Sequence, residues 1–467
     1  MIPAGTRLDL DARTRRPRPG LVTGGSPWRL LRISAPADRL LDAWAVGVPV
    51  ADRPAVRRFA GRLVDTGLAH PRPGPADATP AVTVVIPVRD RPAGLAATLS
   101  ALGPRDDVVV VDDASADPDR TAGIVASRPG TRLARRGERG GPAAARNTGW
   151  RNLRTAEVVA FLDADCLPEP GWAQRLGRFF SDPQLVAIAA RVVPVGAGGG
   201  TLDAYETARS PLDLGGAAAP VRPGSRVPYV PAAALLVRRS ALEEVGGFDE
   251  TLPTGEDVDL VWRLGRLGRV RYEPSVTVGH PVRPGWREWA AQRYGYGRSA
   301  APLAERHGAA VTPLTLGPGT AVAWALVVAG RPRAAAAAAL AAAVASSGPR
   351  FASLRDLGVR VVAAEVSAGP AIAEAVRRSW WPVALLAATR SRRARRWLAL
   401  GTLVPPLQEW WRRRPAGIGP GRFVACRVVD DLAYGAGVWA GVVSCRSRGG
   451  LRCLLPARPA RPGSRAV

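Results

Sequence analysis

The stretch VTVVIPVRDR (82–91) is a continuous run of apolar, mostly β-branched residues that closes on charged ones. Such a run is typical of a strand buried on both faces of a parallel sheet, followed by a loop. Two similar runs follow, VVVVDDAS (108–115) and EVVAFLDADCLPEPGW (157–172), with the helical pattern GGPAAARNTGW (140–150) between them. This alternation predicts an α/β, Rossmann-like, doubly wound and mostly parallel sheet, which binds its ligands at the carboxyl ends of the strands.

The sharpest local signal is a pair of carboxylates after the third run, Asp163 and Asp165, separated by Ala164. Two carboxylates at the end of a buried strand can hold one hard divalent cation together with the diphosphate that it bridges, so Mg²⁺ or Mn²⁺ is expected. The bound ion would neutralise charge on a leaving nucleoside diphosphate. The alternative is a solvated turn, which is how this tripeptide occurs in most proteins.

Residues at the other strand ends are candidates for nucleotide binding. Asp113 follows the second strand, and a carboxylate there can accept the imide N–H of a uracil base. Pro87, Arg89 and Asp90 at the end of the first strand would flank the same nucleotide, and Arg146 in the following helix can face phosphate. Helix caps and an ordinary helix start are the alternatives.

A second acidic cluster lies in GGFDETLPTGEDVDLVWRL (246–264), where Glu256 and Asp257 begin a helical pattern. One carboxylate there can accept the proton of an acceptor hydroxyl as that hydroxyl attacks an anomeric carbon. The loop before it, with Gly247 and Phe248, is expected to lie under the sugar and contact the acceptor. Acids at a helix N-terminus are also stabilised by the helix dipole, so capping is the alternative.

In this order and spacing, VTVVIPVRD, VVVVDDAS, GGPAAARNTG, FLDADCLP, GGFDE and GEDVDLVWRL resemble the GT-A glycosyltransferases of family 2. The resemblance covers residues 82 to about 260. It implies an inverting, metal-dependent transferase with a UDP-sugar donor. Asp113 would meet the base, Asp163 and Asp165 the sugar-diphosphate and the metal, and Asp257 would be the catalytic base with Glu256 beside it.

The resemblance also implies roles for residues that come after the acidic cluster. His280, at the end of the predicted strand YEPSVTVGHPV (272–282), stands where several GT-A enzymes have a third metal ligand. A structural histidine is the alternative. In processive members a Gln/Arg/Trp cluster then holds the acceptor glycan, and the counterparts here are Trp286, Gln292, Arg293 and Tyr294. The sequence reads QRYGYG rather than the full motif, which puts processivity in doubt, and a helix core is the alternative.

The net charge and the cysteine content limit the class of protein, but they do not identify its binding partner. All 65 Lys+Arg residues are arginine, and the net charge is +26. This excess of base suits anionic substrates, an anionic membrane surface or nucleic acid. Four cysteines without CxxC spacing fit a reducing cytosol. Residues 1–16 lack the apolar run of a signal peptide.

The N-terminal residues 1–79 are predicted to form a separate unit. RLDLDARTRR (7–16) reads as a hairpin, and Ser26-Pro27 is suited to open the first of three amphipathic helices before the linker PRPGPADATP (71–80). This size and pattern resemble the winged-helix fold of PqqD-like domains, which bind a peptide as an added edge strand. Winged helices also bind DNA, but no nucleic-acid partner is expected here.

This N-terminal unit, fused to a family 2 transferase and combined with GGSPWRLLR, LVDTGLAHPRP and RYGYGRSAAPLAERHG, resembles the glycosyltransferases of mycofactocin biosynthesis. That resemblance implies transfer of glucose, as a β-1,4-linked oligomer, to a peptide-derived redox cofactor precursor. The alternatives are a lipid or cell-surface polysaccharide acceptor, or a winged-helix binding protein with an inactive transferase domain. The inactive-transferase alternative is opposed by the presence of all four acids on which the chemistry would depend, namely Asp113, Asp163, Asp165 and Asp257.

Residues 80–310 are predicted to form the transferase domain and residues 311–467 an apolar, arginine-rich helical region. The stretch 311–330 carries no charge, and 334–348 is alanine-rich. SRRARR (391–396) and WRRR (411–414) between apolar segments suit an anionic headgroup surface. Association with the inner membrane surface, through a hairpin span or interfacial helices, is therefore expected, with a soluble, cytoplasmic helical region as the alternative.

Overall fold

The computed structural model describes residues 1–74, 79–104, 106–153, 155–196, 198–283, 285–347, 354–445 and 447–457. It divides into two compact units, one of residues 1–197 and 209–282 and one of residues 198–208 and 283–467. Residues 75–78 of the predicted linker lie outside the described residues.

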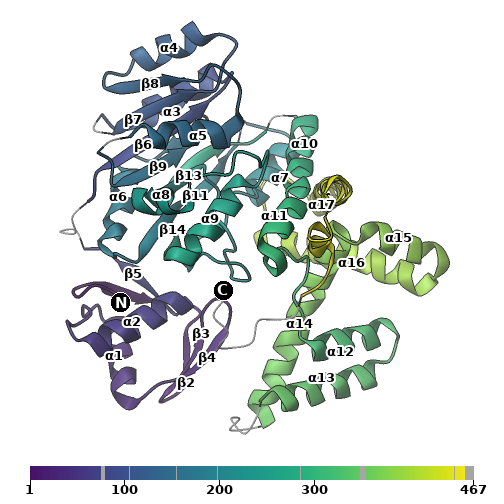
Figure 1. The fold of residues 1–467 in the computed structure, drawn as a ribbon. Coiled ribbons are helices and arrows are strands. Elements are labelled where there is room, and N and C mark those ends of the chain that lie inside the picture. The colour runs from purple at the N-terminus through teal and green to yellow at the C-terminus, as the bar shows by residue number, and fades with distance from the viewer. Residues whose placement is uncertain are drawn as a thin grey trace. The chain divides into compact units, whose positions relative to one another are not determined.

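The N-terminal part of the first unit is built of short strands and two helices around its own apolar core (Figure 1). Strand β1 pairs antiparallel with β5, while β2, β3 and β4 form a separate three-stranded sheet. Trp44 of α1 stacks on Phe59 of α2 at 5.7 Å between ring centroids. The elements are β1 (Arg7–Leu10), β2 (Arg15–Arg18), β3 (Leu21–Gly24), β4 (Arg29–Arg32), α1 (Ala35–Ala45), α2 (Pro54–Thr66) and β5 (Ala69–Arg72).

Three sequence predictions for this segment are wrong. The described residues of the segment form two helices, α1 and α2, rather than three. Arg7–Leu10 does not pair with Arg15–Arg18, because β1 runs beside β5, with Arg7 opposite Arg72. Ser26-Pro27 does not open a helix, because the next residues, Arg29–Arg32, form β4 against β3. The helix begins later, at Ala35, where the Ser34 side chain accepts a hydrogen bond from the N–H of Ala37 and so caps it.

Among the described residues, the main sheet of the first unit has nine strands in the order β10-β14-β11-β13-β9-β6-β7-β8, with β12 beside β14 (Figure 1). The central pairs β6–β7, β6–β9 and β7–β8 are parallel, as is β11–β14, whereas β13, β10 and β12 run antiparallel to their neighbours. This confirms the predicted mostly parallel sheet. The strands are β6 (Val82–Val88), β7 (Asp107–Asp112), β8 (Thr131–Arg135), β9 (Val158–Leu162), β10 (Leu167–Pro168), β11 (Leu185–Val195), β12 (Ala219–Pro220), β13 (Ala234–Arg238) and β14 (Arg269–Pro281).

Helices cover both faces of this sheet. Alternate residues of each strand point to opposite faces, and the strands are apolar on both, so each face must be buried. Val84, Ile86 and Val88 of β6 belong to a core that α3, α4 and α6 complete. On the other face α5 lies so close that a Cβ added to Gly149 would stand 2.3 Å from a methyl group of Val85. The helices are α3 (Pro92–Ala101), α4 (Pro118–Ala126), α5 (Gly141–Arg151), α6 (Trp172–Gly177), α8 (Arg239–Val245) and α9 (Glu256–Leu267), with a 3₁₀ turn at Arg178–Ser181.

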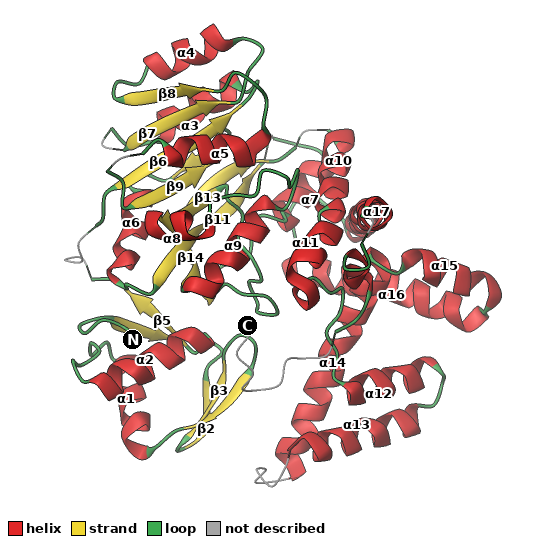
Figure 2. Cartoon of the chain, in the orientation of Figure 1, coloured by secondary structure: helices red, strands yellow, loops and turns green. Residues whose placement is uncertain are grey.

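The second unit is built of helices (Figure 2). Its closest packing joins α10 to α17 through glycines: a Cβ on Gly297 would lie 1.9 Å from the Tyr434 carbonyl oxygen, and one on Gly437 would lie 2.0 Å from that of Tyr294. The helices are α7 (Thr201–Arg209, all but its last residue in this unit), α10 (Trp286–Arg298), α11 (Ala300–His307), α12 (Pro318–Val328), α13 (Pro332–Ser347), α14 (Leu354–Arg378), α15 (Trp381–Arg390), α16 (Arg392–Arg413) and α17 (Pro420–Ser444), with 3₁₀ turns at Gly308–Ala310 and Gly450–Leu454.

Among the described residues, no helix combines the length and the apolar character that crossing a bilayer requires.

Candidate active site

Four strands of the sheet end at one edge, and most of the predicted site residues of the first unit follow them. Arg89 and Asp90 come after β6, Asp113 after β7 and Asp163 after β9, while His280 is the next-to-last residue of β14. These four strands all run in one direction, so their carboxyl ends meet. The structure therefore gathers residues as far apart in the sequence as Arg89 and His280 at the edge where open α/β sheets bind ligands.

The turn after β9 presents its two acids and hides the residue between them. The N–H of Cys166 donates to the Asp163 carbonyl at 3.0 Å, which closes the turn, and the Ala164 side chain is buried. Helix α3 lies directly against the turn, since a Cβ on Gly94 would stand 2.9 Å from the Ala164 carbonyl oxygen. Ala164, predicted to contact the nucleotide sugar, thus has its side chain inside the core.

Asp163, Asp165 and His280 each offer a ligand atom, and these atoms lie within 4.8 Å of one another. His280 Nε2 is 3.5 Å from Asp165 Oδ1. Pairing of β10 with β14, with Leu167 opposite Gly279, brings the acid turn next to the histidine. Two carboxylates and one imidazole fit a divalent cation such as Mn²⁺ or Mg²⁺ that completes its coordination with water and phosphate oxygens.

The three candidate metal ligands, Asp163, Asp165 and His280, form what we call the donor set. Arg146 of α5 connects it to the second acidic cluster, which contains Glu256 and Asp257. Its Nη2 donates to Asp163 Oδ1 at 2.7 Å, and its Nη1 donates to Glu256 Oε1 at 2.9 Å. Burial by itself would raise the pKa of Asp163, but the adjacent guanidinium outweighs it and keeps that pKa below its ordinary value. Arg146 thereby favours the carboxylate form of Asp163. Sequence reasoning placed Arg146 against phosphate and did not foresee this double contact.

Asp257 and Glu256 lie at the N-terminus of α9, directly after Gly255 in a left-handed conformation. Glu256 is buried against Arg146, whereas Asp257 is half-buried and accepts a hydrogen bond from the Val258 N–H at 2.8 Å. Burial, together with the charge of Glu256, raises the pKa of Asp257 to about 7, and Arg146 opposes the rise. A carboxylate with a pKa near neutrality is suited to take up a proton during a reaction.

The GGFDE loop is held in place by Asn147, a residue for which the sequence motifs predict no role. Its side-chain amide donates to the Phe248 carbonyl at 2.8 Å, and its amide oxygen accepts from the Phe248 N–H at 2.9 Å. Phe248 is buried edge-to-face on Phe161 at 5.0 Å between centroids. A Cβ on Gly247 would collide with the Asn147 oxygen at 2.5 Å. Both predicted acceptor contacts in this loop therefore have packing roles; acceptor contact stays a prediction.

Asp113 and Asp90, the predicted nucleotide contacts, already accept hydrogen bonds from backbone groups. The buried Asp113 carboxylate accepts from the N–H groups of Gly140 and Gly141 at 2.9 and 2.7 Å and from Arg136 Nε at 2.9 Å. Asp90 Oδ1 accepts from the Ala116 N–H at 2.8 Å. These contacts shape the loops at the sheet edge. Pro87 and Arg89 are half-buried beside them.

Arg91 is a further residue that sequence reasoning missed. It stands directly before α3, and its Nη1 is 2.6 Å from Asp165 Oδ2. Its side chain is 46% exposed, so it can move away from the carboxylate without leaving a buried void. The signal was present in the sequence, since Arg91 ends the strand-terminal run VTVVIPVRDR.

The four other predicted acceptor residues belong to the second unit. Arg293 is buried and pairs with Glu206 of α7 and with Asp430 of α17, and Gln292 accepts a hydrogen bond from it at 3.0 Å. Trp286 and Tyr294 are exposed. Arg293 thus serves as an ion-pair centre between three helices, and a direct contact with an acceptor stays a prediction.

Comparison with known proteins identifies the family. The sequence profile described as glycosyl transferase family 2 matches residues 83–246. The pre-mycofactocin glycosyltransferase of Mycobacterium tuberculosis (strain H37Rv) is 41% identical over 466 residues, which cover 97% of this chain and 98% of that protein. The chain belongs to glycosyl transferase family 2. It is a glycosyltransferase of the hexosyltransferase class, and its sheet is the GT-A core that the motifs predict.

More distant likenesses to solved structures accompany this family 2 assignment. A mannosyltransferase from Pyrobaculum calidifontis in complex with GDP-Man and Mn²⁺ is 21% identical, with 73% of this chain and 90% of that one covered and a TM-score of 0.40. GalNAc-T7 with UDP, GalNAc and Mn²⁺ is 18% identical, with coverage of 51% and 52% and a TM-score of 0.37.

Proposed function

We propose that this family 2 glycosyltransferase moves a hexose, with glucose the expected sugar, from a UDP-sugar to the peptide-derived redox cofactor precursor pre-mycofactocin. The observation that carries the chemistry is the bridge of Arg146 between Asp163, a candidate metal ligand, and Glu256, the residue directly before the candidate base Asp257. The acceptor is supported by the 41% identity, over 97% of the chain, to a pre-mycofactocin glycosyltransferase.

On the donor side, Asp163, Asp165 and His280 would hold the divalent cation. When bound, the ion supplies positive charge to the leaving diphosphate. Arg91 pairs with Asp165 and, being 46% exposed, can turn toward a phosphate oxygen instead. Asp113 and the loop that it organises would receive the base.

On the acceptor side, Asp257 would act as general base. As the acceptor oxygen bonds to the anomeric carbon, the bond from that carbon to the diphosphate oxygen breaks, and the acceptor proton passes to the Asp257 carboxylate. A single in-line displacement inverts the configuration, so an α-linked donor gives a β-glycoside. Repetition on the 4-hydroxyl of the added sugar would build a β-1,4 oligoglucoside.

The decisive experiment incubates the protein with a panel of UDP-sugars, each with Mn²⁺ or Mg²⁺, and measures UDP release with and without the peptide-derived acceptor. We expect acceptor-dependent release from UDP-glucose, and a loss of at least about a hundredfold in Asp257→Asn with donor binding retained. Release that needs a lipid-linked or polysaccharide acceptor instead would favour the alternative acceptor class. Full turnover in Asp257→Asn would remove Asp257 from the base role.

We also propose that residues 1–79, which resemble PqqD-like domains, form a unit that guides the acceptor.

We further propose that the helical region from residue 311 lies on the inner membrane surface. This proposal rests on large apolar side chains that face outward from α15 and α16, such as Leu386 and Trp411, which are 59% and 63% exposed. Exposed arginines, including Arg392 and Arg393, accompany them. Apolar and cationic side chains together suit an anionic lipid surface.

A further inference from the structure

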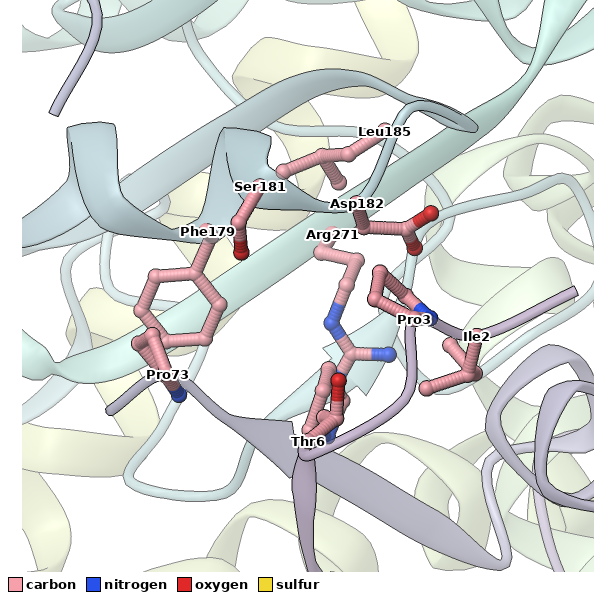
Figure 3. A pocket seen from close by; sticks show the side chains of 10 residues that line it. Ile2, Pro3, Thr6, Pro73, Phe179, Ser181, Asp182, Leu185 and Arg271 are labelled. Atoms are coloured by element: carbon pink, nitrogen blue, oxygen red, sulfur yellow. The ribbon is translucent and has the colours of Figure 1, made fainter. Parts of the chain in front are cut away.

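A small pocket, with room for about one or two water-sized groups, opens to solvent where the N-terminal segment meets the main sheet (Figure 3). The N-terminal segment contributes Thr6 and Pro73 to its lining, and the sheet domain contributes Phe179 and Arg271. Most of its walls are apolar, and the Thr6 and Ser181 side chains bring hydroxyl groups to it. All of these residues belong to the first compact unit.

The polar group at the centre of this pocket is the guanidinium of Arg271. Figure 3 shows its side chain reaching between Phe179 and Pro73 on one side and Pro3 on the other. Arg271 is 2% exposed, and its Nη2 lies 3.0 Å from His70 Nδ1. Its Nε and Nη1 have no hydrogen-bond partner among the residues that the structure describes. A buried donor without an acceptor is destabilising, so these two positions call for one.

Among the described residues, neighbouring carboxylates leave Nε and Nη1 of Arg271 without a hydrogen bond. Glu273, the carboxylate whose charge acts most strongly on the pKa of Arg271, accepts a hydrogen bond from the Ser275 N–H at 3.1 Å. Asp182 lines the pocket, but its carboxylate is held by Arg269 at 2.9 Å. Asp11 pairs with the far nitrogen of His70, at 2.9 Å from Nε2, so the imidazole separates that carboxylate from the guanidinium. Burial lowers the pKa of Arg271 to about 10, which still leaves it charged at neutral pH. The pocket wall thus contains a buried cation, two of whose N–H groups have no hydrogen-bond partner among the described residues.

This pocket is separate from the candidate active site. Leu185 of its lining is the first residue of β11, and Arg271 is the third residue of β14. His280 of the donor set follows Arg271 by nine positions on the same strand, which corresponds to about 30 Å of extended chain. The pocket therefore lies at the amino end of parallel strands whose carboxyl ends bear the catalytic acids.

We propose that this pocket binds an oxyanion, a carboxylate or a phosphate group, through the unpartnered N–H groups of Arg271. Guanidinium N–H groups form short, charge-assisted hydrogen bonds with such oxygens, and the apolar surroundings strengthen them by excluding water. Because the lining comes from both the N-terminal segment and the sheet domain, a bound anion stabilises the contact between the two.

The test measures thermal unfolding of the full chain in inorganic phosphate and in acetate, each against sodium chloride of equal ionic strength. A ligand that binds only the folded state raises the Tm, by about 2 °C when it is well above its Kd. We expect this rise in the wild type and in Arg132→Gln, an exposed arginine of β8 that does not line the pocket, and not in Arg271→Gln. A response to phosphate alone assigns the site to phosphate-bearing ligands, and a response to acetate as well assigns it to carboxylates too.

No rise beyond that in chloride, or an equal rise in Arg271→Gln, would overturn the proposal, the latter because the anion then binds elsewhere. If Arg271→Gln does not fold, Ser181→Glu provides an independent test, since it offers a carboxylate from the pocket wall itself. We expect Ser181→Glu to unfold at a higher temperature than Ser181→Gln in chloride and to lose the anion response. Equal Tm values with the response retained would contradict the proposed site. Neither readout depends on glycosyl transfer.

Discussion

Arg146 Nη2 donates a 2.7 Å hydrogen bond to Asp163 Oδ1, in a site where the arginine is 4% exposed. The other arm of the same guanidinium reaches Glu256. One buried cation therefore lowers the pKa of Asp163, a candidate metal ligand, and pairs with Glu256, the neighbour of the candidate base Asp257. The two halves of the site are coupled through this residue.

Replacing Arg146 with glutamine should destabilise the first unit strongly. The buried Glu256 and the partly exposed Asp163 would lose their counter-charge, and breaking the buried pair with Glu256 costs about 3–5 kcal/mol. Urea unfolding of the variant against the wild type measures the loss. Arg151→Gln, at the exposed end of the same helix, is the matched control and should change the free energy of unfolding by less than about 1 kcal/mol. Equal effects in both variants would contradict the bridging role.

The rate of transfer should depend on the protonation of Asp257. Its pKa is raised from 3.8 to about 7, and only the carboxylate can accept the acceptor's proton, so kcat/KM should rise with pH through about 7 and then level off. A profile from about pH 5.5 to about pH 8.5 with saturating metal tests this, and a flat profile would argue against Asp257 as the base.

The same shift has a consequence for stability. The folded state binds the Asp257 proton more tightly than the unfolded state, so this group's contribution becomes less favourable as pH rises from about 4 to about 7. Asp257→Asn, which carries no charge, should therefore unfold at a higher temperature than the wild type at about pH 8 and with little difference at about pH 4. If Asp257→Asn unfolds at a lower temperature than the wild type at about pH 8, the pKa of Asp257 is not raised in the folded protein.

Removing the imidazole of the donor set should weaken metal binding. His280→Ala leaves Asp163 and Asp165 in place, so we expect the Mn²⁺ concentration for half-maximal activity to rise by about 10-fold or more. Calorimetric titration of Mn²⁺ provides a readout that does not require turnover. His307→Ala, on α11 and outside the donor set, should titrate like the wild type.

Arg293→Gln distinguishes a structural role from an acceptor-binding role. Since Arg293 is buried between Glu206 and Asp430, the substitution should destabilise the helical unit by about 3–5 kcal/mol while UDP-sugar affinity is unchanged. Arg298→Gln, exposed on the same helix, is the control. A raised KM for the acceptor without any loss of stability would instead support the acceptor contact that the motif predicts.

Vesicle sedimentation tests the membrane proposal. The protein should bind vesicles that contain anionic lipid, bind neutral vesicles less, and be released by salt, because the attraction of exposed arginines is screened. Leu386→Asp should reduce binding several-fold, whereas Leu133→Asp, an exposed leucine of β8, should not. Equal binding to neutral and anionic vesicles would remove the electrostatic part of the proposal.

The sequence by itself determined the main sheet and the location of its acids. Runs such as VVVV before Asp112 and VVAFL before Asp163 can be satisfied only by burial on both faces, and parallel strands then bring the residues after their carboxyl ends to one edge. The helix from Glu256 and the strand that carries His280 are set by the same local periodicity.

Only the tertiary structure decided which partners these residues meet. Leu30 and Leu31 fit a helical pattern equally well, but pairing with β3 places them in a strand. Arg146, Asn147 and Arg293 gave no local sign of their contacts, because their partners lie 110, 101 and 137 positions away. Periodicity reports which face of an element is buried, whereas hydrogen bonds and ion pairs between distant segments depend on how the elements pack, and that information is spread over the whole chain.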